Sequence, residues 1–74
     1  MNTKLIIFTD GGARGNPGPA GIGAVIYNNK KEKLVEISKY LGETTNNQAE
    51  YRALIIALKK AKDLGAKELD VFLD

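Results

Sequence analysis

The sequence predicts a small α/β domain in which one helix crosses between strands of a single mixed sheet. Three observations predict this class. Three runs of strand character follow one another over the first forty or so residues, a long helical stretch comes next, and a last short apolar run ends the chain. Tight connections between the first three strands indicate an antiparallel meander. A helix between the third and fourth strands indicates a right-handed crossover, so we expect the strand order 3-2-1-4.

The first expected strand, residues 5–9, is continuously apolar and rich in β-branched side chains, which is typical of a central strand buried on both faces. Asp10 ends it. Residues 11–20 contain so many glycines and prolines that we expect neither helix nor regular strand there. Strand character returns over residues 21–27, and residues 28–31 form a polar turn. Residues 34–41 alternate between apolar and polar side chains, which indicates a strand near an edge with one wet face.

The helix is expected to begin at Thr45, because Thr45 and Gln48 have the spacing of a capping box. It should run to Leu64, with Gly65 as its C-terminal stop. Residues 69–73 form the last expected strand, directly before Asp74.

Composition excludes several kinds of site. The chain has no cysteine and no histidine, so disulfides, thiolate metal sites and histidine-based catalysis are absent. The net charge of +2 is too small to indicate a nucleic-acid partner by itself. The apolar run near the N-terminus is too short for a signal peptide, and no run approaches a membrane span, so we expect a cytoplasmic protein.

The expected topology gathers carboxylates at one edge of the sheet. Asp10 and Asp74 end two parallel strands, and the helix starts at the same edge, where open α/β sheets usually place their sites. Glu50 is expected to lie in the apolar stripe of the helix, since the apolar helix residues nearest to it in projection fall within about 40° of it: Leu54, Ala57, Ala61 and Leu64. The alternative is an ordinary first-turn glutamate that is favoured there by the helix dipole. Three neighbouring acids without histidine suit Mg²⁺ or Mn²⁺.

Three segments resemble the motifs of type 1 ribonuclease H, in order and along the whole chain. They are Thr-Asp-Gly-Gly-Ala-Arg-Gly-Asn-Pro-Gly-Pro-Ala-Gly over residues 9–21, Thr-Asn-Asn-Gln-Ala-Glu over 45–50, and Val-Phe-Leu-Asp over 71–74. The resemblance implies a ribonuclease H-like fold, of which residues 1–74 form the N-terminal half. It also implies a metal-dependent endonuclease that hydrolyses the RNA strand of an RNA–DNA hybrid.

The resemblance also implies residue roles. Asp10 would be shared by two Mg²⁺ ions, with the backbone of Gly11 beside it, and Glu50 and Asp74 would complete one metal site. The substrate contacts would come from the glycine-rich loop and the start of the helix: Gly12, Arg14, Asn16, Asn46 and Asn47. The plainer alternatives are turn glycines, an ordinary Asn-Pro turn, and asparagines that serve the start of the helix.

The family chain continues past the third acid and there supplies a fourth acidic metal ligand. We therefore expect the 74-residue chain to have little or no activity alone. Two alternative functions follow, a non-catalytic hybrid-binding remnant and a folding module that needs a second half. We also expect the helix to cover the face of the sheet that carries Phe8 and Phe72. The opposite face would then carry an uncovered apolar patch: Leu5, Ile7, Leu69, Val71 and Leu73. Stacking of two such faces, or pairing of the unprotected edge of the last strand, would mediate homo-oligomerisation.

Overall fold

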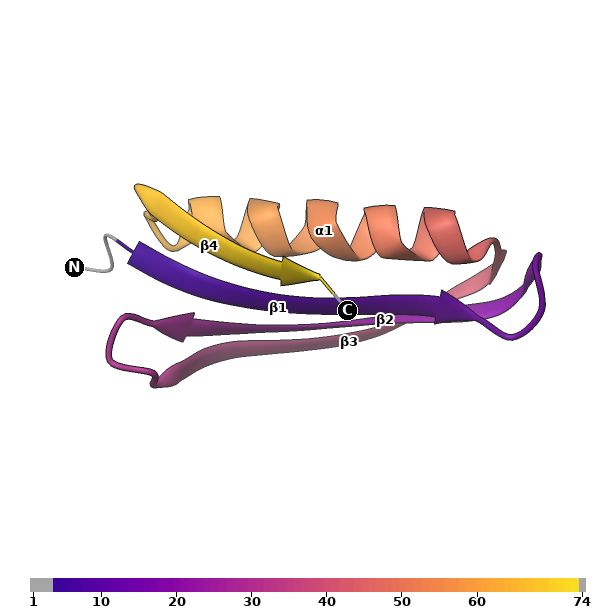
Figure 1. Cartoon of the computed structure of the whole chain (residues 1–74), viewed down its shortest axis with the longest axis horizontal. Coiled ribbons are helices and arrows are strands. Elements are labelled where there is room, and N and C mark those ends of the chain that lie inside the picture. Colours follow the sequence, from indigo (N-terminus) through magenta and orange to yellow (C-terminus); the bar gives the residue numbers. More distant parts are fainter. Residues whose placement is uncertain (1–3, 74) are drawn as a thin grey trace.

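The computed structural model describes residues 4–73, which form one sheet and a helix that lies along one face of it (Figure 1). The elements are β1 (Lys4–Ala13), β2 (Gly18–Asn28), β3 (Lys33–Thr44), α1 (Asn46–Asp63) and β4 (Glu68–Leu73). The strand order is β3-β2-β1-β4. β1 pairs with β2 in antiparallel and with β4 in parallel orientation. The predicted element order, strand order and crossover are therefore confirmed.

The glycine-rich segment is more regular than the sequence predicts. β1 continues to Ala13 and β2 begins at Gly18, so the expectation of no regular structure over residues 11–20 is wrong. Antiparallel pairing supplies the missing order, because it satisfies the backbone groups of residues that have weak strand preference. The remaining loop closes tightly. The N–H of Arg14 donates to the carbonyl of Pro19 at 2.8 Å, and a side chain at Gly18 would collide with the Arg14 carbonyl.

β3 shows the predicted alternation. Ile37 packs against the core, whereas Glu36 and Ser38 are exposed. The strand extends past the predicted residues 34–41 to Lys33 and Thr44, and two irregularities in its pairing with β2 each admit an extra residue. These extra residues are Leu34 and Leu41, and both contact the core.

α1 begins and ends close to the predicted points. Thr45 is the N-cap, and its hydroxyl accepts a hydrogen bond from the Gln48 N–H at 3.2 Å. The helix ends at Asp63, and Gly65 follows with a φ of 81°. Its buried side is a stripe of alanines alone: Ala49, Ala53, Ala57 and Ala61. Such small side chains let the helix lie close to β1 and β2. The helix lacks the apolar length that a membrane span requires.

The prediction of which sheet face the helix covers is wrong. Leu5 and Ile7 are fully buried beneath α1, whereas Phe8 is 48% and Phe72 is 52% exposed. The prediction assumed that Asp10 turns toward Glu50 across the sheet. Side chains of a strand alternate between faces, so Asp10 shares the open face with Phe8, while Thr9 and Gly11 face the helix.

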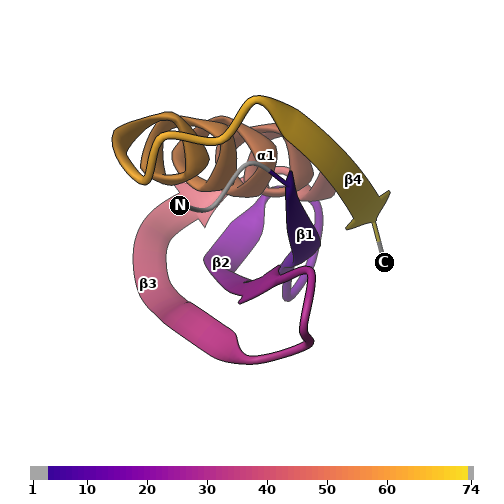
Figure 2. The same cartoon turned by 90° about the vertical axis from the view of Figure 1, so that its left-hand side faces the viewer.

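β4 is only partly covered. Val71 packs against the core, but Leu69 and Leu73 are exposed. The reason is visible in Figure 2, where α1 lies over β1 and β2 and β4 splays away to the side. Of the five residues predicted to form an open apolar patch, only these two leucines are therefore exposed.

Candidate metal and nucleic-acid site

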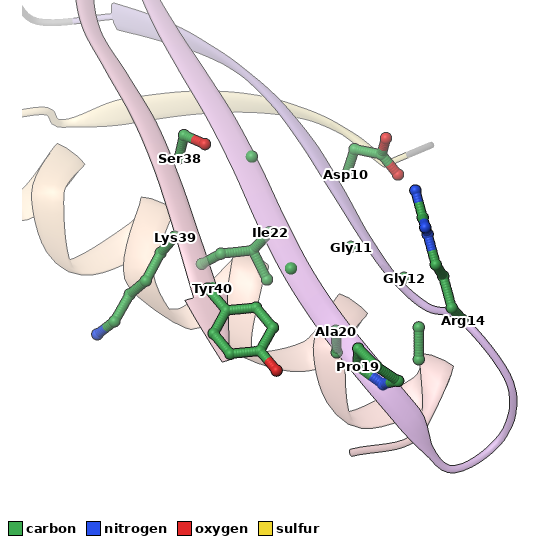
Figure 3. A pocket seen from close by; sticks show the side chains of 13 residues that line it. Asp10, Gly11, Gly12, Arg14, Pro19, Ala20, Ile22, Ser38, Lys39 and Tyr40 are labelled. Carbon is green, nitrogen blue, oxygen red and sulfur yellow. The ribbon is translucent and has the colours of Figure 1, made fainter. Parts of the chain in front are cut away.

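Asp10 lies in the second half of β1, opposite Gly23 of β2. It is exposed and lines a groove formed by β1, β2 and β3 (Figure 3). Glycines supply much of the lining beside Asp10, so backbone is accessible there. The side chain of Arg14 points toward Asp10, and Tyr40 of β3 stands on the opposite side of the groove. The groove therefore combines one carboxylate, one guanidinium and an exposed aromatic ring.

Glu50 lies in the second turn of α1. It directly follows Ala49 in the sequence, which places it about 100° around the helix from the alanine stripe. The prediction that Glu50 lies in the middle of the apolar stripe is therefore wrong, since it occupies the flank and is exposed. That flank faces the seam between β1 and β4, because a small recess is lined by Glu50 together with Thr9, Gly11 and Leu73.

Gly11 explains how α1 approaches β1 at this point. A β-carbon at Gly11 would lie 2.6 Å from the carbonyl carbon and oxygen of Ala49 and 2.8 Å from the Glu50 nitrogen. Only glycine permits this contact between strand and helix backbones. Asp10 immediately precedes the contact on β1, and Glu50 is part of it on α1. Asp10 and Glu50 therefore flank one backbone contact, with the Asp10 side chain on the open face of the sheet and Glu50 on the helix.

The third predicted acid, Asp74, lies outside the described residues. Within residues 4–73, no three His, Cys, Asp or Glu side chains form a cluster suited to a metal ion. The pairing of β4 with β1 extends to Leu73, which is opposite Thr9. In the described part of the chain the site thus consists of Asp10, Glu50 and the backbone around Gly11.

Within residues 4–73 neither acid is in an ion pair, although the Arg14 side chain points toward Asp10. Among the described residues, ion pairs join Lys4 to Asp70 at 3.2 Å and Lys33 to Glu36 at 3.1 Å. Neither pair involves Asp10 or Glu50. Both acids are exposed, and the available donors are carboxylate and backbone carbonyl oxygens. An oxygen-only donor set fits a hard divalent cation such as Mg²⁺ or Mn²⁺.

Two of the predicted substrate residues, Asn16 and Asn46, form hydrogen bonds within the protein. The Asn46 N–H donates to Oδ1 of Asn16 at 3.2 Å, and the Ala13 N–H donates to Oδ1 of Asn46 at 2.5 Å. Sequence reasoning missed this link, although the first N–H groups of any helix need acceptors from outside it. The three other predicted contacts, Gly12, Arg14 and Asn47, are exposed near the same end of the molecule.

A family model for RNase H matches residues 2–74. The chain belongs to the RNase H family. Bifunctional protein Rv2228c of Mycobacterium tuberculosis is 50% identical over 72 residues, which cover 96% of this chain and 20% of that protein. Other relatives, 44–48% identical, bear the name ribonuclease H or ribonuclease HI.

Solved structures show the same fold. LC11-RNase H1, isolated from compost by a metagenomic approach, is 59% identical, with a TM-score of 0.89 over 100% of this chain and 55% of that one. A structure of LC11-RNase H1 in complex with an RNA/DNA hybrid is 57% identical, with a TM-score of 0.85 over 93% of this chain and 53% of that one. The RNase H chain thus spans about half the length of these solved structures and a fifth of the mycobacterial relative.

Proposed function

We propose that this chain carries the metal-binding half of an RNase H active site that hydrolyses the RNA strand of RNA–DNA hybrids. The observation that carries the proposal is the backbone contact at Gly11, which brings Asp10 of β1 and Glu50 of α1 to the same end of the sheet. The hybrid complex of the similar LC11-RNase H1 supports the substrate class.

Asp10, Glu50 and Asp74, with the backbone of Gly11, would hold Mg²⁺ or Mn²⁺. Bound divalent ions supply an activated water and stabilise the leaving oxygen of the scissile phosphate. The chain's own contribution is to fix the two described carboxylates on paired or helical backbone. β1 is paired with β2 at Asp10, and Glu50 lies within a capped helix that touches β1. Rigid placement of this kind lowers the entropy lost when a cation binds.

The surroundings of the acids suit a nucleic-acid backbone. Arg14 provides a guanidinium beside Asp10, which can pair with a phosphate. Asn47, exposed in the first turn of α1, provides amide groups at the same end of the molecule. Such groups can reach the shallow minor groove of a hybrid, where the 2′-hydroxyls distinguish RNA from DNA.

A titration of the chain with Mn²⁺, followed by calorimetry or the paramagnetic effect of the ion, tests the proposal. We expect Asp10→Asn to weaken Mn²⁺ binding by at least roughly 10-fold, because it removes a carboxylate ligand. The matched control is Asp70→Asn, which neutralises an exposed carboxylate of β4 that pairs with Lys4 instead. Equal Mn²⁺ affinity for the original chain and Asp10→Asn would exclude Asp10 as a ligand.

A further inference from the structure

We propose that Asn16 and Asn46 act as positioning residues that hold Glu50 against β1, an inference that rests on the proposed function. We call their two hydrogen bonds, Asn46 N–H to Asn16 Oδ1 and Ala13 N–H to Asn46 Oδ1, the asparagine clamp. The clamp joins the loop after β1, the end of β1 and the first residue of α1. Its role is therefore to fix the helix start relative to the strand that carries Asp10.

The asparagine clamp provides a hydrogen-bond acceptor for a backbone N–H group at the start of α1. The first N–H groups of a helix have no partner within it. The Thr45 hydroxyl accepts from Gln48, and Asn16 accepts from Asn46, which is two residues earlier. Asn46 in turn accepts from Ala13, so the helix is tied to both the loop and β1.

Asn16 is itself firmly held. It lies in a short loop between β1 and β2, and the Arg14 N–H closes this loop by donating to Pro19 at 2.8 Å. A side chain at Gly18 would collide with the Arg14 carbonyl, so the two ends of the loop lie close together. The acceptor that Asn16 offers to α1 is therefore anchored to the sheet.

Glu50 lies one helical turn beyond Asn46, and the Gly11 contact with Ala49 and Glu50 lies two residues before Ala13 on β1. Strand and helix are thus tied at two adjacent points. The fully buried side chains of this half of α1 are Ala49 and Ala53, with Ile56 partly buried beyond them, so small side chains form the contact nearest the helix start. The asparagine clamp fixes the position of α1 relative to β1, as contacts between larger core side chains would otherwise do.

Both acceptor atoms of the asparagine clamp are Oδ1 atoms. Substitution of Asn16 can therefore distinguish its role as an acceptor in the clamp from a role of its amide group as a hydrogen-bond donor to the substrate. Asn16→Ala removes the acceptor and the amide donor together. Asn16→Asp keeps an acceptor oxygen for the Asn46 N–H, replaces the amide donor with a second oxygen and adds a negative charge. Asn28→Ala is the matched control, because Asn28 Oδ1 accepts from the backbone N–H groups of Lys30 and Glu32 in the turn at the other end of the sheet.

The experiment measures Mn²⁺ affinity and amide hydrogen exchange of the four proteins at a temperature where circular dichroism shows each to be folded. Asn16→Ala should bind Mn²⁺ on the order of 10-fold more weakly, as is typical when a residue that orients a metal ligand is lost. Its Glu50 and Asn46 amides should exchange faster. Asn28→Ala should match the original chain in Mn²⁺ affinity and at these two amides, and Asn16→Asp should match it in the exchange of these two amides.

Unchanged Mn²⁺ affinity and unchanged Glu50 exchange in Asn16→Ala would overturn the positioning role. So would an equal loss in Asn16→Ala and Asn28→Ala, since that pattern reports general destabilisation. If the original chain binds no Mn²⁺, the proposed function fails, and the exchange of the Glu50 and Asn46 amides still decides whether the clamp holds the helix start.

Discussion

Gly11 is the residue on which the site geometry depends most directly. Its missing side chain lets the backbones of β1 and α1 touch between Asp10 and Glu50. Gly11→Ala would place a methyl group 2.6 Å from Ala49 backbone atoms, which cannot yield without moving the helix. We expect a loss of about 1–3 kcal/mol in the free energy of unfolding, the usual cost of overpacking. Urea denaturation measures it.

Gly12→Ala is the control for this prediction. The nearest atom to its β-carbon would be Oδ1 of Asn46 at 3.7 Å, an ordinary contact. The same chemical change one residue later should therefore alter stability little. A similar loss in both variants would mean that the cost comes from the backbone conformation of the strand rather than from contact with α1.

At the residue scale, the sequence predicted local structure better than long-range contacts. The helix cap at Thr45 and the stop at Gly65 follow from local patterns, because each depends on its immediate neighbours. The asparagine clamp was missed, since Asn16 and Asn46 are 30 residues apart and no local pattern pairs them. Glu50 was placed on the correct helix but in the wrong part of its surface.

At the element scale, α1 depends on its cap. Thr45→Ala removes the hydroxyl that accepts from the Gln48 N–H, and we expect a loss of about 1 kcal/mol in the free energy of unfolding. Thr45→Ser keeps a hydroxyl at this position and should retain most of the stability. Chemical denaturation of the three proteins measures both effects. Equal stability of Thr45→Ala and the original chain would show that the asparagine clamp suffices at this helix start.

The elements themselves were largely predictable, and their lengths and faces were not. Strand order follows from connection lengths, which are visible in the sequence. The extension of β1 to Ala13 depends on pairing with β2, a long-range effect that overrides the weak strand preference of glycine. The buried side of α1 is its alanine stripe, and alanine marks a buried side less clearly than larger leucines do. The covered face of the sheet was predicted wrongly because Asp10 was expected to turn toward Glu50, whereas it lies on the open face.

At the scale of the whole molecule, the chain spans about half the length of the similar RNase H1 structures. We therefore expect the 74 residues alone to cleave an RNA–DNA hybrid only slightly above background in the presence of Mg²⁺. A gel assay with a labelled RNA strand measures this. Rapid cleavage that disappears in Asp10→Asn and persists in Asp70→Asn would show that residues 1–74 suffice for catalysis.

The open face of the sheet carries an aromatic cluster that reaches across three strands. Phe8 of β1 stacks on Phe72 of β4, with ring centroids 5.1 Å apart, and forms a T-shaped pair with Tyr27 of β2, with ring centroids 5.8 Å apart. About half of each phenylalanine is exposed. Monomeric proteins rarely leave contiguous apolar patches of more than a few hundred Å² in water. The apolar patch predicted from Leu5, Ile7, Leu69, Val71 and Leu73 is not formed, and the exposed aromatic cluster lies on the opposite face of the sheet.

We expect the isolated chain to self-associate through this cluster at high concentration, because pairing two open faces removes both aromatic patches from water. Phe72→Gln should shift the population toward monomer, whereas Tyr51→Gln should not. Tyr51 is 62% exposed but lies on α1, away from the cluster. Size-exclusion chromatography with light scattering over a range of concentrations measures the mass, and circular dichroism checks that each variant is folded. A chain that stays monomeric at every concentration, or one that Tyr51→Gln dissociates as readily as Phe72→Gln, would exclude the aromatic cluster as the contact.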